Sequence, residues 1–140
     1  MIKNQLTENI VGFVLKPDST SQQIKTLFEN ELNSNGFTIL DFSRKKLRKK
    51  EIEILNCVKG SWRYDLNKYY EYMMQDETIG YLVKHDTLCS DSLFAFSKKL
   101  RGLHYEAYNC NNNSLRGKIH NILNKSEPFE NYLHITDSKE

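Results

Sequence analysis

The sequence predicts an α+β domain in which helices cover one face of a four-stranded antiparallel sheet. Short apolar runs that suit strands alternate with stretches in which apolar residues recur every three or four positions, as in amphipathic helices. The first such alternation gives the order strand, helix, strand. A length of 140 residues suits one compact domain, 1–140, and is too short for two domains that each bury a core.

The first strand and helix have the clearest boundaries. Ile10–Leu15 (IVGFVL) is a continuous apolar run typical of a buried strand, and it stops at Lys16-Pro17-Asp18, where we expect a loop. Thr20 followed by Gln23 matches a capping box, and the helix that it starts should end at Gly36. The apolar face of this helix consists of Ile24, Leu27, Phe28 and Leu32.

The remaining elements follow from the same two periodicities. Further strands are predicted over Phe37–Phe42, Thr78–Lys84 and Tyr132–Ile135. Further helices are predicted over Leu47–Asn56, Tyr64–Met74 and Ser92–Leu100. Tyr108–Ser114 contains four asparagines and is expected to be a surface loop. This order of elements suits a ferredoxin-like sandwich.

The composition excludes several classes of protein. A hydrophobic fraction of 39% with 27% charged residues is ordinary for a soluble globular domain. The sequence has no apolar run long enough to cross a membrane, and its polar start does not resemble a signal peptide, so we expect a cytoplasmic protein. Cys57, Cys89 and Cys110 show no CxxC spacing, which argues against a disulfide framework and a zinc site.

One segment departs from the nearly neutral balance of the chain, whose net charge is +2. Six of the seven residues from Arg44 to Lys50 are basic. The favoured interpretation is a solvated helix start that Glu51 and Glu53 partly neutralise, so a nucleic acid is not expected as a partner. The competing hypothesis is a surface that binds a polyanion.

Three motifs in order along the chain resemble those of nucleoside diphosphate kinases. The segment from Asn131 to Ser138 (NYLHITDS) is similar to the family's active-site signature around its histidine. Lys16-Pro17-Asp18 directly after the first strand and Leu115-Arg116-Gly117 ahead of the histidine match two further landmarks. The spacing from Asp18 to Gly36 also resembles the family's.

The resemblance implies a phosphotransferase in which His134 carries a phosphoryl group between nucleoside triphosphates and diphosphates. Lys16 and Arg116 correspond to cations that bind phosphate, and Arg101 is the best counterpart of another, with Lys99 next. Asn131 is implied as a ligand of the nucleotide, and Thr136 as a supporting residue. The resemblance further implies Mg²⁺ that arrives with the nucleotide and a homo-oligomer.

The same residues suit this chemistry on physical grounds. Phosphoryl transfer needs an in-line nucleophile and cations that offset the spreading negative charge, and a neutral imidazole is a competent nucleophile near pH 7. Considered singly, each residue has a simpler explanation: His134 as a structural histidine, Lys16 as a solvated strand end, Arg116 as a surface cation and Asn131 as a turn residue. The ordered conjunction of the motifs favours the functional interpretation.

Other functions stay open at this point. A degenerate member of the family would keep the fold and bind nucleotide, or serve as an interaction module, without turnover. Trp62, Tyr64, Tyr69 and Tyr70 are the aromatic residues that could stack on a base, although such clusters more often belong to a core. In the family a glutamate further downstream orients the histidine, whereas six residues follow His134 here, which predicts weak activity for this sequence. Glu140, a backbone carbonyl or a partner chain could replace that glutamate.

Overall fold

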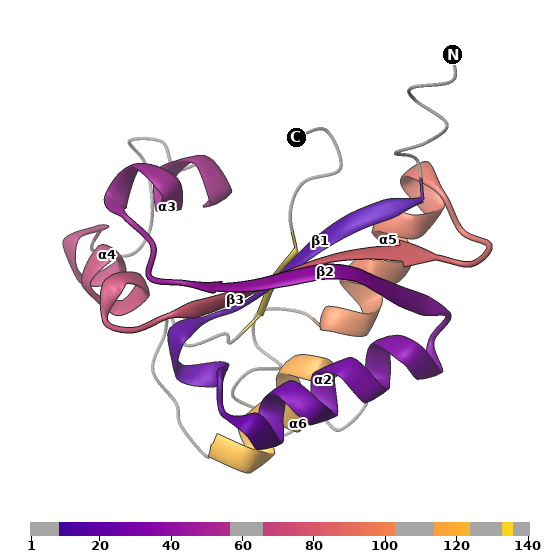
Figure 1. Ribbon diagram of the computed structural model, residues 1–140, viewed down its shortest axis with the longest axis horizontal. Helices are drawn as coiled ribbons and strands as arrows, with labels where there is room; N and C mark the ends of the chain where they lie inside the picture. The colour runs from indigo at the N-terminus through magenta and orange to yellow at the C-terminus, as the bar shows by residue number, and fades with distance from the viewer. Residues whose placement is uncertain (1–8, 57–65, 103–113, 124–132, 136–140) are drawn as a thin grey trace.

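The computed structural model describes residues 9–56, 66–102, 114–123 and 133–135 (Figure 1). The strands are β1 (Ile10–Leu15), β2 (Phe37–Lys45), β3 (Thr78–His85) and β4 (Leu133–Ile135). The helices are the 3-10 turn η1 (Pro17–Ser19), α2 (Gln22–Ser34), α3 (Lys49–Asn56), α4 (Leu66–Met74), α5 (Ser90–Arg101) and α6 (Leu115–Leu123). None of these described helices is both long and apolar enough to cross a membrane.

The strands form one antiparallel sheet in the order β2-β3-β1-β4, which confirms the α+β class. β2 runs further than predicted because its residues pair with β3 as far as Lys45. A bulge at Leu40 shifts the register between Ile39 and Asp41, and this edge residue is 48% exposed. β4 contributes three residues, Leu133–Ile135, and pairs only with β1.

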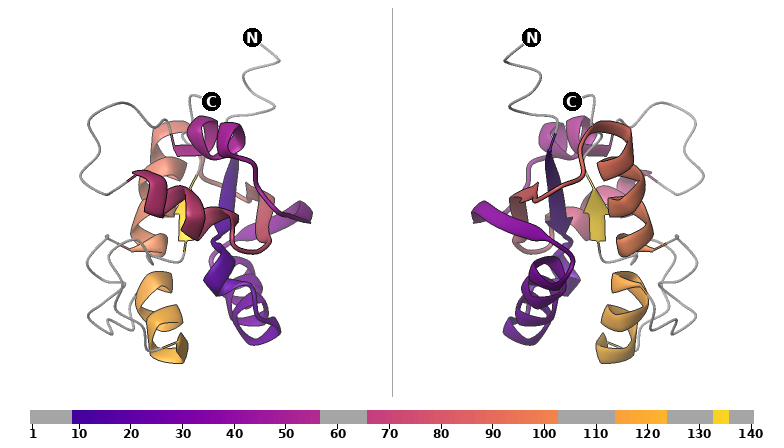
Figure 2. Two further views of the ribbon diagram at one scale, coloured as in Figure 1. Left: turned by 90° about the vertical axis from the view of Figure 1, so that its left-hand side faces the viewer. Right: turned by 90° about the vertical axis from the view of Figure 1, so that its right-hand side faces the viewer.

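The main core lies between one face of the sheet and the helices α2, α5 and α6 (Figure 2). Phe13 of β1 and Phe28 of α2 are fully buried, and their rings meet edge to face at 5.5 Å between centroids. Apolar residues that alternate along β1 and β3 supply the sheet side of this core, as a strand with one covered face requires.

The helices α3 and α4 form a second, smaller core, which corrects the expectation that all helices cover one face. They lie together at one end of the sheet, where β2 ends and β3 begins (Figure 1). Their core consists of Ile52, Tyr70, Tyr72 and Met73. α4 also packs against η1, so this helical pair borders the turn that follows β1.

The boundaries of α2 show one wrong prediction and one confirmed one. The cap is Ser21, whose hydroxyl accepts a hydrogen bond from the backbone N–H of Ile24 at 3.3 Å. Thr20, the expected cap, instead donates to the carbonyl of Pro17 because η1 occupies the preceding residues. At the other end Gly36 has a φ of +87°, the left-handed conformation that favours glycine after a helix.

His85 is a structural histidine. Its Nδ1 accepts backbone N–H bonds from Thr87 and Leu88 at 3.1 and 3.0 Å, so Nε2 carries the proton and donates to the carbonyl of Asn35 at 2.8 Å. This ring fills the space beside Gly36, where an added Cβ would lie 2.9 Å from Nε2.

The helix α6 was not predicted. Ser114 starts it by accepting the backbone N–H of Gly117, and Leu115, Ile119 and Leu123 recur along it at helical spacing. That spacing could have revealed the helix, but Gly117 within it and the asparagine-rich residues before it obscured the pattern. The predicted loop before Ser114 lies outside the described residues.

Candidate functional site

The first element of the candidate site is the end of β1. Lys16 follows Leu15 and immediately precedes Pro17, which begins η1; its carbonyl accepts the N–H of Ser19 at 2.8 Å. The side chain of Lys16 is 3% exposed. The simpler explanation of a solvated strand end is therefore wrong, since a lysine at such a place normally extends into water.

The second element is β4, which carries His134. The register pairs Leu133 with Leu15 and His134 with Val14, so the lysine that follows Leu15 and the predicted catalytic histidine belong to neighbouring strands at nearly the same level. Asn131 and Thr136 lie outside the described residues.

The third element is Arg116 at the start of α6, which is 5% exposed. Its Nη2 donates to the carbonyl of Leu133 at 2.7 Å, and its Nη1 donates to the carbonyl of Gly102 at 3.1 Å. The guanidinium thus connects α6 both to the first residue of β4 and to the end of α5. Arg116 is therefore not a surface cation.

Arg101, at the C-terminal end of α5, meets the same carbonyl. Its Nε donates to Gly102 O at 3.1 Å, and burial lowers the pKa of its guanidinium. Lys99, the next-best candidate, is exposed. The guanidinium of Arg101 thus shares an acceptor with that of Arg116.

Arg101 and Arg116 share the carbonyl of Gly102, Arg116 also donates to the first residue of β4, and Lys16 follows the residue that pairs with it. We call these three residues the cation cluster. Neighbouring like charges that are largely shielded from water favour an anion among them, because an opposite charge offsets both repulsion and desolvation. A phosphoryl group that gains negative charge in a transition state is such an anion. The sequence predicted these three residues, but nothing in it indicated that Gly102 would join the two arginines.

Metal binding by the protein has no support in the described part of the chain. Among those residues no three His, Cys, Asp or Glu side chains come together to hold an ion. Cys89, which is exposed and free, lies at the start of α5.

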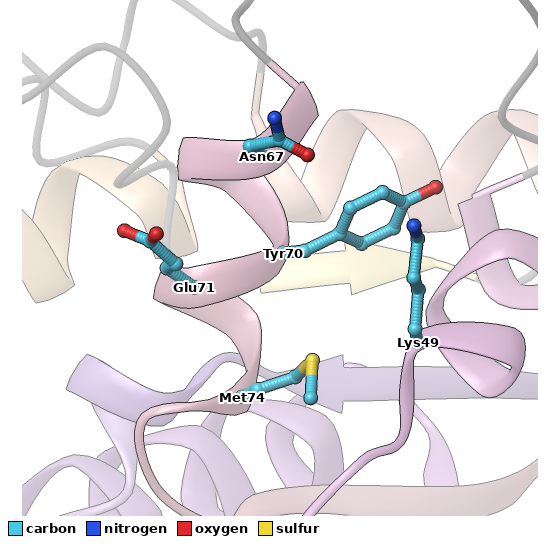
Figure 3. Close-up of a pocket in the computed structure, with 5 residues that line it drawn as sticks. All are labelled: Lys49, Asn67, Tyr70, Glu71 and Met74. Carbon is cyan, nitrogen blue, oxygen red and sulfur yellow. The ribbon is translucent and has the colours of Figure 1, made fainter.

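A separate pocket of about 480 Å³ lies between α3 and α4 (Figure 3). Of the four aromatic residues considered for base stacking, Tyr70 lines it, with the Lys49 ammonium 5.0 Å from its ring centroid. In Figure 3 the lining side chains lie in front of β4, which is drawn behind α4. The other lining residues are Asn67, Glu71 and Met74.

Comparison with known proteins supports the fold. No family model matches the sequence, and no curated protein is significantly similar to it. Among solved structures the chain is similar to the nucleoside diphosphate kinase of Aquifex aeolicus, with a TM-score of 0.69 and 14% identity over 91% of this chain and 84% of that one. It is also similar to a halophilic nucleoside diphosphate kinase from Halobacterium salinarum in complex with CDP, with a TM-score of 0.72 and 10% identity over 93% of this chain and 78% of that one. The chain therefore has the fold of nucleoside diphosphate kinases.

Proposed function

We propose that the protein is a phosphotransferase that moves the terminal phosphoryl group of a nucleoside triphosphate to a nucleoside diphosphate through phosphorylated His134. The observation that carries this proposal is the cation cluster, in which Arg116 donates to the first residue of β4, one residue before the histidine of the signature-like segment. Its fold, similar to that of nucleoside diphosphate kinases, adds support. The ferredoxin-like arrangement of four strands belongs to the same proposal.

The chemistry has two halves. A ring nitrogen of neutral His134 attacks the terminal phosphorus, the bond between that phosphorus and the bridging oxygen breaks, and the diphosphate leaves with the electron pair. A second diphosphate then attacks the phosphohistidine through a terminal oxygen and releases the imidazole. Lys16 and Arg101 stabilise the negative charge that spreads over the transferred group. Mg²⁺ bound to the nucleotide phosphates would neutralise part of the same charge.

The remaining predicted residues have supporting roles. Asn131 would donate an amide hydrogen bond to the sugar or to a bridging oxygen, and Thr136 would support the histidine segment. Arg116 places its guanidinium between β4 and α5, so its first role is to hold the strand that carries His134. A homo-oligomer in the cytoplasm is part of the proposal, and light scattering of the purified protein tests its assembly.

A radiolabelling experiment tests the proposal. The protein is incubated with Mg²⁺ and ATP labelled at the terminal phosphate, and an acid-labile, base-stable label should appear on the wild type but not on His134→Ala. The labelled protein should then pass its label to added diphosphate. Without labelling of the wild type the transferase proposal fails. Calorimetry with ATP then decides whether a nucleotide-binding domain without turnover takes its place.

A further inference from the structure

The segment in which β2 leads into α3 forms a strongly basic surface at one end of the sheet (Figure 1). All six of its basic side chains are exposed, and we call them the basic surface: Arg44, Lys45, Lys46, Arg48, Lys49 and Lys50. The whole chain carries only +2, so the rest of the sequence is net acidic. The positive charge of the protein is therefore concentrated in one place, which favours a negatively charged partner there.

Acids of the protein neutralise only part of this charge. Within the described residues the ion pairs of the basic surface all go to Glu51, which binds Lys45 and Arg48. Lys49 and Lys50 are the first two residues of α3, where cations repel the positive end of the helix dipole. An arrangement that opposes helix stability without an internal benefit is typical of a functional surface. This observation reverses the weight that the sequence alone gave to a solvated helix start.

Exposed apolar side chains border the basic surface. Leu40 and Phe42 of the edge strand β2 are 48% and 50% exposed, and Leu82 of the neighbouring strand β3 is 45% exposed. These three are the large apolar residues that the described part of the chain leaves exposed. Asp41 lies among them, and its carboxylate accepts the backbone N–H of Phe42 at 2.9 Å. The basic surface begins two residues after Phe42, so apolar groups and cations form one continuous surface along β2.

Two features of β2 argue against the addition of a further strand at this edge. The bulge at Leu40 interrupts the regular ladder, and Arg44 and Lys45 place cations at the end of the strand. Bulges and charged side chains are the means by which edge strands avoid pairing with another chain. A partner of this surface must therefore supply negative charge and accept apolar side chains without adding a strand.

We propose that the basic surface and the three apolar side chains beside it bind the surface of an anionic membrane. This peripheral contact goes beyond the phosphotransfer proposed for His134. Cations attract the headgroups of anionic lipids, and exposed apolar side chains enter the boundary between headgroups and acyl chains. Peripheral binding is typically stable when two such signals act together. A nucleic acid would neutralise the cations, but Leu40 and Leu82 offer no ring on which its bases could stack.

The electrostatic contacts are tested by cosedimentation with vesicles. The probe is phosphatidylserine mixed with phosphatidylcholine, and pure phosphatidylcholine is the neutral comparison; the wild type should bind only the anionic vesicles. Lys46→Ala combined with Lys50→Ala should weaken binding by about 25-fold, at about fivefold for each cation near the surface. The control is Lys98→Ala with Lys99→Ala, which removes the same charge at two exposed positions of α5 and should leave binding nearly unchanged.

The apolar contacts are tested by the binding that survives high salt. At about 0.5 M NaCl most of the electrostatic attraction is screened, so the residual binding measures the apolar part. Leu40→Gln should abolish most of this residue and weaken low-salt binding about fivefold, because about half of a leucine side chain no longer leaves water. Ser43→Gln, at an exposed position of the same strand, should change neither quantity.

A spectroscopic signal tests whether the edge of the sheet enters the membrane. Phe42→Trp keeps an aromatic ring at this position and adds a second emission to that of Trp62, the only tryptophan of the chain. Indole rings favour the membrane interface, so the added emission should shift to shorter wavelength on anionic vesicles and stay unshifted with neutral ones.

Three results would overturn the proposal. Equal losses of binding in the two lysine pairs would show a general effect of net charge. Binding that disappears entirely at high salt, with no shift of the added emission, would assign the surface to a polyanion such as nucleic acid. Self-association that Leu40→Gln disrupts in analytical ultracentrifugation would assign the apolar edge to a second copy of the chain. Because vesicle binding is measured without nucleotide, failure of the phosphotransferase proposal would leave this one standing.

Discussion

Removing the guanidinium of Arg116 should loosen β4 before it affects any other element. Arg116→Ala removes a donor from the carbonyls of Leu133 and Gly102, in a place where the arginine was 5% exposed. The carbonyl of Gly102 keeps the bond from Arg101, so the main loss is at Leu133. A buried carbonyl that loses its donor costs about 1–3 kcal/mol, and we expect a loss of that size in the free energy of unfolding. The stability of an ordinary domain is about 5–15 kcal/mol, so such a loss is readily measured. Arg116→Lys keeps one donating group and should lose about half as much free energy of unfolding.

Lys118→Ala is the matched control, because it removes a cation from the same helix. Lys118 pairs with Glu31 of α2 and ties α6 to that helix instead of to β4. The pair is partly exposed, so its loss should cost only about 0.2–1 kcal/mol.

Urea unfolding measures these differences, and hydrogen exchange shows where they arise. The amides of Leu133–Ile135 should exchange faster in Arg116→Ala than in Lys118→Ala, and labelling of His134 by ATP should slow by about tenfold or more as the strand loses its position. Equal stabilities for the two variants would refute the reasoning. So would a loss of stability that leaves exchange in β4 unchanged.

Three further predictions concern the cation cluster, a backbone constraint and an acid-sensitive ion pair. Lys16→Met should slow labelling of His134 by about 10²-fold and leave the fold intact. The same change at the exposed Lys45 should not slow labelling. Equal effects of the two changes in a labelling assay would contradict the role assigned to Lys16. Gly36→Ala should cost about 1–3 kcal/mol in thermal unfolding because of its positive φ and the neighbouring imidazole, while Gly80→Ala, whose Cβ meets nothing within 4 Å, should be nearly neutral. Burial raises the pKa of Glu29, but the hydrogen bonds from Lys25 and Tyr81 lower it by more. The net pKa is therefore below its usual value. The group therefore stabilises the fold above its unfolded pKa and loses that effect as the pH falls, so the Tm difference between wild type and Glu29→Gln should shrink from pH 7 to pH 3.

Local periodicity was sufficient to predict most of the elements. β1 has the predicted bounds, because a continuous apolar run that stops at a lysine and a proline has few alternatives. The helix before Gly36 was also predicted, but its cap lies at Ser21 because Pro17 first starts a 3-10 turn. α6 was missed since its only local signal competed with an internal glycine.

The sequence by itself determined which residue types carry the proposed chemistry. Lys16, Arg116 and His134 stand in motifs whose order is visible without any structure, and their chemical suitability follows from charge and pKa alone. The sequence did not predict that α3 and α4 form a core of their own. An amphipathic pattern shows which face of a helix is apolar, but it does not show which surface that face covers.

The tertiary structure alone decided how these residues meet. Arg116 and Leu133 are 17 positions apart, and a hydrogen bond at that separation depends on the packing of α6 and the pairing of β4. Packing likewise determined that Lys16 is buried and that Lys46 and Lys50 stay exposed, although all three are lysines. A side chain's charge is fixed by its own chemistry, whereas its solvation and its partners depend on elements distant in the chain.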